Sequence, residues 1–296
     1  MLEREEKEMG DQLRFHYGNP EDTGSWDQAA SVFAAHDSVN SERTSSLPLV
    51  QFWKPKGKAR KLNSLAKALL KTCVGNSFNV EDVEKLLFEY PVPVNKEPKC
   101  KGKASMTDLM IISKSHAIAI EAKWTECKEK YESISEWKKE GKDETNRNNV
   151  LKGWIKYINA FVKSEVLETE NLGEYAKIPY QLLHRIASAC AVAQQQGKSE
   201  AIVIYQLFYD SEGCVSKGEM KSFAKGLAEH YGNLFKRLKK VRFYLALVET
   251  KINQSPKLVE ILNRVTDKDR SSLNDIFVLM QTEDVYEFSV PITILT

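Results

Sequence analysis

The sequence predicts an α/β protein in which buried strands alternate with amphipathic helices. Two short apolar runs, 109–112 and 117–120, flank a polar break over 113–116, the pattern of a β-hairpin built from two buried strands. A longer apolar run over 200–209 is the clearest buried strand in the chain, and a helix over 180–193, rich in small residues, precedes it. At 296 residues with 42% hydrophobic content, the chain can bury a sizeable core.

The remaining elements follow from hydrophobic spacing and from residues that start or stop helices. Asn63 and Asn79 are placed to cap helices over 64–73 and 80–90, and Pro91 would end the second of these. The other predicted elements are strands over 47–53, 243–248 and 286–295 and helices over 148–162, 217–239 and 256–264. Residues 1–46 are predicted to form an acidic N-terminal arm that packs back on the domain, with an interaction segment as the alternative, and residues 47–296 a single domain. The highly charged stretch 125–146 is expected to be a mobile excursion.

The hairpin brings two carboxylates together. Centring its turn between Lys114 and Ser115 places Asp108 opposite Glu121, and Lys123 follows on the same face of the strand as Glu121. Directly opposed residues have Cβ atoms about 4.5–5.5 Å apart, a destabilising distance for like charges. A divalent cation would relieve that repulsion, because Mg²⁺ takes carboxylate oxygens as ligands. The alternative is a solvated strand end with an incidental ion pair between Lys123 and Glu121.

Thr107-Asp108, a gap of 12 residues and Glu121-Ala122-Lys123 resemble the active-site signature of the PD-(D/E)xK nuclease superfamily, which has the restriction-endonuclease-like fold. The resemblance implies a central mixed β-sheet flanked by helices. It implies that Asp108, Glu121 and the backbone carbonyl of Ala122 bind Mg²⁺ or Mn²⁺, and that Lys123 positions the attacking water. Thr107 stands where the family has proline.

Two further site residues depend on the same resemblance. Some members carry a glutamine on the helix after the hairpin, with a tyrosine four residues later. Here Gln181 matches the glutamine, but Arg185 stands four residues later in place of the tyrosine, so only half of this pattern is present. Gln181 would orient the substrate or the Lys123 ammonium; the alternative is a solvated helix glutamine. Members often add an acid from a preceding helix, for which Glu84 and Glu81 qualify by position only.

Charge is unevenly distributed along a chain of net charge +2. Residues 1–43 hold ten acidic and four basic residues, whereas residues 51–71 hold seven basic residues and no acid. Clustered charge, rather than the total, is what a nucleic-acid-binding surface requires. The predicted phosphate contacts are Lys56, Lys58, Arg60, Lys61, Lys101 and Lys103. The alternative for this run is an ordinary solvated surface.

Several classes of protein are disfavoured by the sequence. No apolar run reaches the roughly 18 residues of a membrane span, and the N-terminus has no signal-peptide core. Five scattered cysteines without a C-x-x-C pair favour reduced thiols, a cytoplasmic location and no zinc site. We therefore expect a Mg²⁺-dependent endodeoxyribonuclease of the restriction, defence or repair type. The alternative is a catalytically inactive nuclease-like module that binds nucleic acid or protein; a homodimer or a partner protein is left open.

Overall fold

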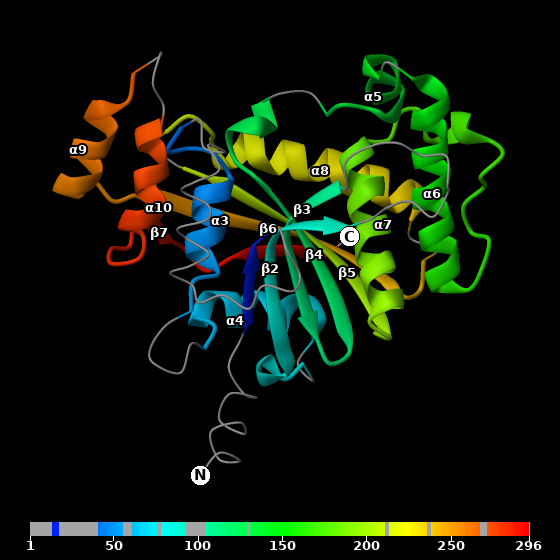
Figure 1. Ribbon diagram of the computed structural model, residues 1–296, viewed down its shortest axis with the longest axis horizontal. Helices are drawn as coiled ribbons and strands as arrows, with labels where there is room; N and C mark the ends of the chain where they lie inside the picture. The colour runs from blue at the N-terminus through cyan, green and yellow to red at the C-terminus, as the bar shows by residue number, and fades with distance from the viewer. Residues whose placement is uncertain are drawn as a thin grey trace, which may run out of the picture.

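The computed structural model describes residues 14–17, 41–55, 61–75, 78–92, 105–128, 131–141, 143–210, 213–235, 238–266 and 271–295. It shows a mixed α/β architecture in which an eight-stranded mixed sheet is flanked by helices (Figure 1). The strand order is β1-β2-β3-β4-β5-β6-β7, and β8 also pairs with β6. The predicted fold class is confirmed at this level.

The sheet combines an antiparallel half with a parallel half. The strands are β1 (Arg14–Tyr17), β2 (Val83–Val92), β3 (Ser105–Ser113), β4 (His116–Lys123), β5 (Glu200–Tyr209), β6 (Val241–Ile252), β7 (Tyr286–Phe288) and β8 (Ile292–Leu295). β2, β3 and β4 pair antiparallel, and β4, β5 and β6 pair parallel. β1 joins β2 in parallel, while β7 and β8 run antiparallel to β6.

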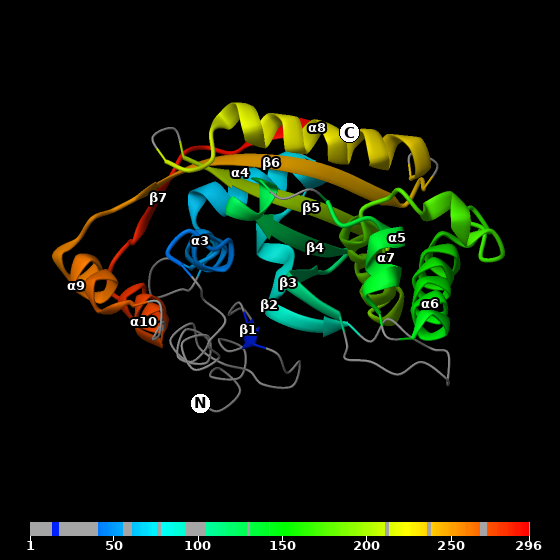
Figure 2. The same ribbon diagram turned by 90° about the horizontal axis from the view of Figure 1, so that it is seen from above.

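Helices cover both sides of these strands. They are α3 (Ser46–Phe52), α4 (Ser64–Val74), α5 (Ile134–Glu140), α6 (Glu144–Val162), α7 (Tyr180–Gln195), α8 (Lys217–Leu234), α9 (Pro256–Arg264) and α10 (Asp275–Leu279), with 3₁₀ turns at Val80–Asp82, Thr125–Lys128, Leu172–Tyr175 and Ser271–Asn274. In both ribbon views α5, α6 and α7 gather on one side of the strands and α3 and α4 on the other (Figures 1 and 2). α7 packs directly on β4 and β5, and α6 packs on α7.

The predicted hairpin is confirmed together with its register. Leu109 pairs with Ile120 and Ile112 with Ala117, as a turn centred between Lys114 and Ser115 requires. The Ser113 hydroxyl accepts a hydrogen bond from the His116 N–H at 3.0 Å and closes the turn. Residues 117–122 of β4 are buried, because α7 covers one face of this central strand.

The predicted helix over 80–90 is wrong. Asn79 does cap a 3₁₀ turn through its contact with the Glu81 N–H at 3.2 Å, but the chain then extends into β2. Val83 and Leu86 have helical spacing in the sequence, yet β2 lies between β1 and β3, and its inward face is set by pairing with both. Tertiary pairing overrides local propensity here.

Two further predicted strands need correction. Residues 47–53 belong mostly to α3, a short helix buried almost all round, so its apolar run has neither helical nor strand periodicity. The tail over 286–295 is two short strands rather than one, with Pro291 in the break between them.

Other predictions agree with the structure. The helix over 64–73 is α4, and Asn63 caps it by accepting the Ala66 N–H at 2.9 Å. The strand over 200–209 and the helix over 256–264 have the predicted bounds. Within the arm, Arg14–Tyr17 pairs with β2, as packing back requires. The cysteines at 73, 127, 190 and 214 are free thiols.

The charged excursion is tied to the start of α7. Ile134 donates its N–H to the Ile178 carbonyl at 2.8 Å, and Tyr180 donates to the Glu132 carbonyl at 3.1 Å. The Trp137 ring stacks on Tyr180 with centroids 5.7 Å apart. α5 is therefore packed against the helix that contributes to the site described next.

Candidate active site

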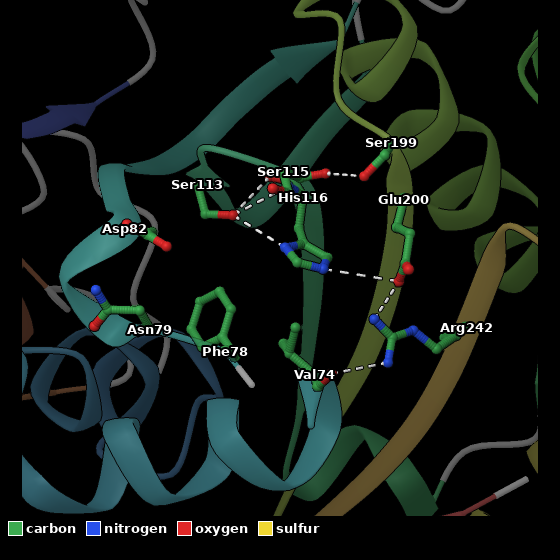
Figure 3. A pocket seen from close by; sticks show the side chains of 10 residues that line it. All are labelled: Val74, Phe78, Asn79, Asp82, Ser113, Ser115, His116, Ser199, Glu200 and Arg242. Carbon is green, nitrogen blue, oxygen red and sulfur yellow. Dashed lines mark hydrogen bonds and ion pairs between the residues drawn. The ribbon is translucent and has the colours of Figure 1, made fainter. Parts of the chain in front are cut away.

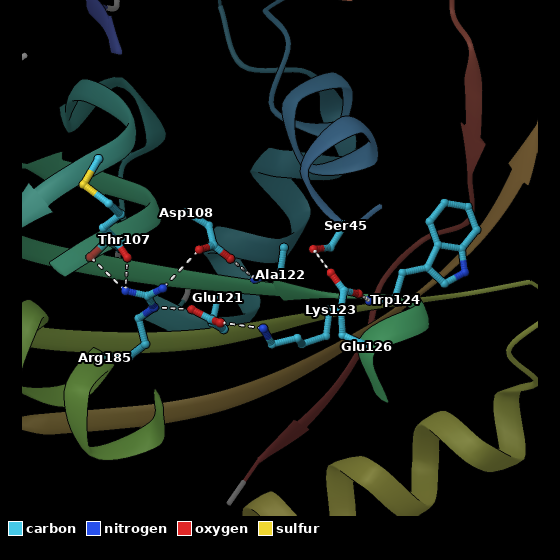
Figure 4. Close-up of polar contacts among 10 residues, drawn as sticks. Ser45, Thr107, Asp108, Glu121, Ala122, Lys123, Trp124, Glu126 and Arg185 are labelled. Carbon is cyan, nitrogen blue, oxygen red and sulfur yellow. Dashed lines mark hydrogen bonds and ion pairs between the residues drawn. The ribbon is translucent and has the colours of Figure 1, made fainter. Parts of the chain in front are cut away.

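Four charged side chains converge where β4 ends (Figure 4). Asp108 comes from β3, Glu121 and Lys123 come from β4, and Arg185 comes from the middle of α7. Glu121 and Arg185 are almost fully buried, with 1% and 5% of their side chains exposed, while 24% of Asp108 is exposed. The hairpin register and the packing of α7 on β4 bring the four groups together.

The Arg185 guanidinium binds both carboxylates at once. Its Nε donates to Glu121 Oε2, and its Nη2 donates to Asp108 Oδ1 at 3.0 Å. Its Nη1 donates to the Met106 carbonyl and reaches the Thr107 hydroxyl at 3.4 Å. Every nitrogen of the guanidinium is engaged, so the side chain ties α7 to β3 and β4.

The other two carboxylate oxygens are also paired. Lys123 Nζ lies 2.9 Å from Glu121 Oε1, and the Ala122 N–H donates to Asp108 Oδ2 at 2.8 Å. Ala122 thus contacts the site through its amide, and a role for its carbonyl stays a prediction. Just beyond, Glu126 accepts the Trp124 N–H and the Ser45 hydroxyl, each at 2.8 Å, which fixes the end of β4 against the N-terminus of α3.

Burial and neighbouring charges shift the pKa values of the two carboxyls in opposite directions. Burial, reinforced by the Glu121 charge, raises the pKa of Asp108 to about 6. Burial acts on Glu121 in the same sense, but Arg185 and Lys123 together outweigh it and lower the Glu121 pKa to about 2. The pKa of Lys123 is raised despite burial, because Glu121 and Asp108 stabilise the ammonium. Lys123 is therefore a cation at neutral pH and can donate hydrogen bonds but cannot act as a general base.

A third carboxylate, Glu89 on β2, belongs to the same cluster and was missed by sequence reasoning. Its neighbours Phe88 and Tyr90 pair with Leu109 and Thr107, which places Glu89 beside Asp108 on the adjacent strand. Burial and the Asp108 charge raise the Glu89 pKa to about 8. Its backbone φ of 45° is in the left-handed region, which is strained for a non-glycine residue. Such strain is concentrated at functional sites.

Tyr205 on β5 is a second residue that the sequence did not single out. It pairs with Glu121 across β4 and β5 and is 2% exposed. Burial, and next the Glu121 charge, raise the pKa of its hydroxyl well above the usual value. Among the described residues this hydroxyl has no hydrogen-bond partner. A buried, unpaired hydroxyl beside a carboxylate is a donor available to a bound group.

Gln181 lies in the first turn of α7, half-buried and one helical turn before Arg185. Arg185, rather than Gln181, is the residue of α7 that contacts the carboxylates. The third acid was expected on a helix, but Glu84 lies on β2 and pairs with Lys198 at 3.2 Å, and Glu81 lies in a 3₁₀ turn near Lys61 at 3.7 Å. Neither is part of the cluster.

The predicted phosphate-binding surface is described only in part. Lys61 is exposed and lies near Glu81. The other predicted contacts, at 56, 58, 60, 101 and 103, lie outside the described residues. Phosphate binding by this surface stays a prediction.

A cavity of about 480 Å³ lies at the opposite end of the strands (Figure 3). It is lined by residues from the starts of β4, β5 and β6, among them His116, Glu200 and Arg242. Arg242 Nη2 donates to Glu200, Arg242 Nη1 donates to the Val74 carbonyl at 3.0 Å, and the Phe78 ring packs edge-on against His116. None of the residues predicted to act in catalysis borders this cavity.

The carboxylate oxygens of Asp108 and Glu121 suit a hard divalent cation, since such oxygens are the ligands that Mg²⁺ prefers. Asp108 and Glu121 each already direct one oxygen at a single cationic group, the guanidinium. As arranged, no set of three or more His, Cys, Asp or Glu side chains within the described ranges is positioned to hold a metal ion. A metal would therefore have to take over the oxygens that Arg185 now occupies.

Residues 22–254 match a family described as "Domain of unknown function (DUF6946)". The chain belongs to this family. The match spans β2 to β6 and so includes every member of the charged cluster. No curated protein and no solved structure matches the chain. None of the described helices is long and apolar enough to cross a membrane.

Proposed function

We propose that this DUF6946 protein is a divalent-metal-dependent nuclease that hydrolyses phosphodiester bonds, with DNA as the expected substrate. The observation that carries the proposal is the convergence of Asp108 and Glu121 on one cationic group, with the Lys123 ammonium 2.9 Å from Glu121. Strand order supports it, because an antiparallel hairpin, the later helix α7 and then a parallel strand fit the order expected of a restriction-endonuclease-like core.

Each residue has a chemical task in this proposal. Asp108 and Glu121 would hold the cation, and Glu89 lies beside Asp108 on the adjacent strand. When bound, the cation lowers the pKa of a water molecule and neutralises phosphate charge. Lys123 stays protonated and donates to the attacking water or to a phosphate oxygen, which stabilises charge that develops in the transition state. Tyr205 supplies a further buried donor beside Glu121.

The test is cleavage of plasmid DNA with Mg²⁺ or Mn²⁺, compared with EDTA. Asp108→Asn and Lys123→Ala should each lose cleavage by about 10²-fold or more, as expected for groups that act on the transition state. Lys114→Ala is the matched control, because Lys114 lies at the turn of the same hairpin, paired with Asp82 at 2.7 Å. Undiminished cleavage by a folded Asp108→Asn or Lys123→Ala variant would contradict the proposal.

A second candidate is a nuclease-like module without catalysis. It is favoured by the Arg185 guanidinium, which compensates both carboxylates without a metal. Calorimetric titration with Mn²⁺ discriminates the two readings. Binding that Glu121→Ala abolishes supports the nuclease. No Mn²⁺ uptake, together with no cleavage, supports the binding module.

A further inference from the structure

We propose that Arg185 is a resident counter-cation of this site, and that a divalent cation binds by displacing its guanidinium from Asp108 and Glu121. The inference rests on the proposed function only in placing the metal between these two carboxylates. It assigns Arg185 a role that the signature does not contain, namely setting how strongly and when the site takes up a metal.

Arg185 occupies the position that a bridging cation would need. One guanidinium contacts one oxygen of Asp108 and one oxygen of Glu121, and so occupies the space from which a bridging cation would bind both. The remaining oxygens of the same two carboxylates are held by the Ala122 N–H and by Lys123. Arg185 is therefore the group whose departure would free one oxygen on each carboxylate together.

The charges of the site are already balanced. Arg185 and Lys123 carry two positive charges against the two negative charges of Asp108 and Glu121 when both are ionised. A dication added to that set would meet a guanidinium at contact distance in a site where Glu121 and Arg185 are almost fully buried. Repulsion between like charges is strongest where water is excluded, so a dication and the guanidinium would compete for the same carboxylate oxygens.

The guanidinium also has uncharged hydrogen-bond partners on β3. Nη1 is held by the Met106 carbonyl and lies near the Thr107 hydroxyl, and neither group is a charged ligand. Release from the carboxylates therefore leaves Arg185 with polar partners on β3. An ion pair that only stabilises the fold does not need these two additional contacts of Nη1.

The experiment measures Mn²⁺ affinity by calorimetry and thermal unfolding in EDTA and in Mn²⁺. Arg185→Met should bind Mn²⁺ about tenfold or more tightly than the wild type, within the usual 5- to 150-fold range of such coupling. Its melting temperature should fall in EDTA and recover in Mn²⁺, whereas the wild type should respond weakly. Arg185→Lys, which keeps the charge but not the three-way fork, should bind with intermediate affinity.

Two controls locate the effect. Arg242→Met removes the arginine that pairs with Glu200 at the opposite end of the strands, and should leave Mn²⁺ affinity unchanged. Adding Glu121→Gln to Arg185→Met should abolish the gain in affinity, because one of the freed ligands is then gone. If that double variant still binds tightly, the metal binds elsewhere and the inference is wrong.

Every outcome for Arg185→Met decides the question. If it folds only when Mn²⁺ is present, the metal replaces the guanidinium, as proposed. If it is unfolded both in EDTA and in Mn²⁺, or folds without gaining Mn²⁺ affinity, Arg185 is only a structural tie. The nuclease proposal is tested separately by wild-type cleavage. A wild type that cuts no DNA while Arg185→Met gains Mn²⁺ affinity would refute the activity and leave this inference standing.

Discussion

An arginine–glutamate pair lies at each end of strands β4, β5 and β6, and the arginine at the carboxyl end comes from α7. At the carboxyl end of β4, Arg185 and Glu121 have 5% and 1% of their side chains exposed. At the amino ends, Arg242 and Glu200 are 32% and 40% exposed and border the cavity of about 480 Å³. The pairs share their chemistry but not their access to water.

That difference shows which end is the better candidate for chemistry. Water at the cavity end screens charge, so a pair there contributes little in either direction. At the carboxyl end of β4, which we call the closed end because its charged side chains are mostly buried, each charge must be compensated by the protein. The pKa values of Asp108 and Glu121 move apart as a result. Ligands of open α/β sheets bind at the carboxyl ends of strands. The converging charges, and not the cavity at the amino ends, therefore mark the candidate active site.

The sharpest way to break this comparison is to neutralise the glutamate at each end. Glu121→Gln leaves Arg185 and Lys123 without a shared counter-charge in a buried site, so we expect unfolding free energy to fall by about 3–5 kcal/mol. Glu200→Gln, at the exposed pair, should cost about 0–1 kcal/mol. Urea denaturation in EDTA measures both. Equal losses would mean that the two ends do not differ in the way we describe.

The second test uses pH and Glu89. Its folded pKa of about 8 lies above the ordinary value of 4.5, so between these values the folded state binds more protons than the unfolded state. Unfolding free energy should therefore fall as pH rises, by up to about 1.4 kcal/mol per unit, and level off above the folded pKa. Glu89→Gln should remove this slope and be more stable than the wild type at pH 8.

The slope is best measured between pH 6.5 and 8. Below that window His184 acts in the opposite sense, because burial lowers its folded pKa well below 6.5 and stability then falls as pH falls. Glu84→Gln is the matched control, since Glu84 lies on the same strand with 44% of its side chain exposed. A wild-type stability that rises with pH across this window would contradict the assignment of Glu89 to the buried cluster.

Sequence alone located Asp108, Glu121 and Lys123, because Asp108 precedes one apolar run and Glu121 and Lys123 follow the next, and the period and turn of these runs fix the register of one hairpin. Glu89 could not be found in this way. The segment that holds it has apolar residues at helical spacing, and its strand character arises from pairing with β1 and β3, which are distant in sequence. Pro91, which would end a helix, lies instead within β2.

Arg185 was visible in the sequence only as a departure from a pattern, four residues after Gln181. Its role depends on the rotation of α7 against β4, which is set by packing of the small residues along that helix. α3 was mispredicted for a related reason, since residues 47–52 are all buried and carry no periodicity. Local patterns thus predicted the central hairpin and β5, whereas contacts between distant segments determined the rest of the site.

The smallest expected effect comes from removing one hydroxyl at each end. The hydroxyl of Tyr231 on α8 donates to the Val241 carbonyl at the start of β6 at 3.1 Å. Tyr231→Phe should therefore lower the unfolding free energy by about 0.5–1.5 kcal/mol. Tyr205 has an equally buried hydroxyl with no partner among the described residues, so Tyr205→Phe should be neutral or slightly stabilising. Paired urea titrations compare the two variants.

Measuring the cleavage activity of Tyr205→Phe and Tyr231→Phe tests function as well as stability. If Tyr205 donates to a group bound beside Glu121, Tyr205→Phe should slow metal-dependent cleavage while leaving stability intact, and Tyr231→Phe should do the reverse. A Tyr205→Phe variant that loses stability as Tyr231→Phe does would show that its hydroxyl is already satisfied in the free protein. The closed end of the strands would then be hydrated, and the buried-charge argument for the site would weaken with it.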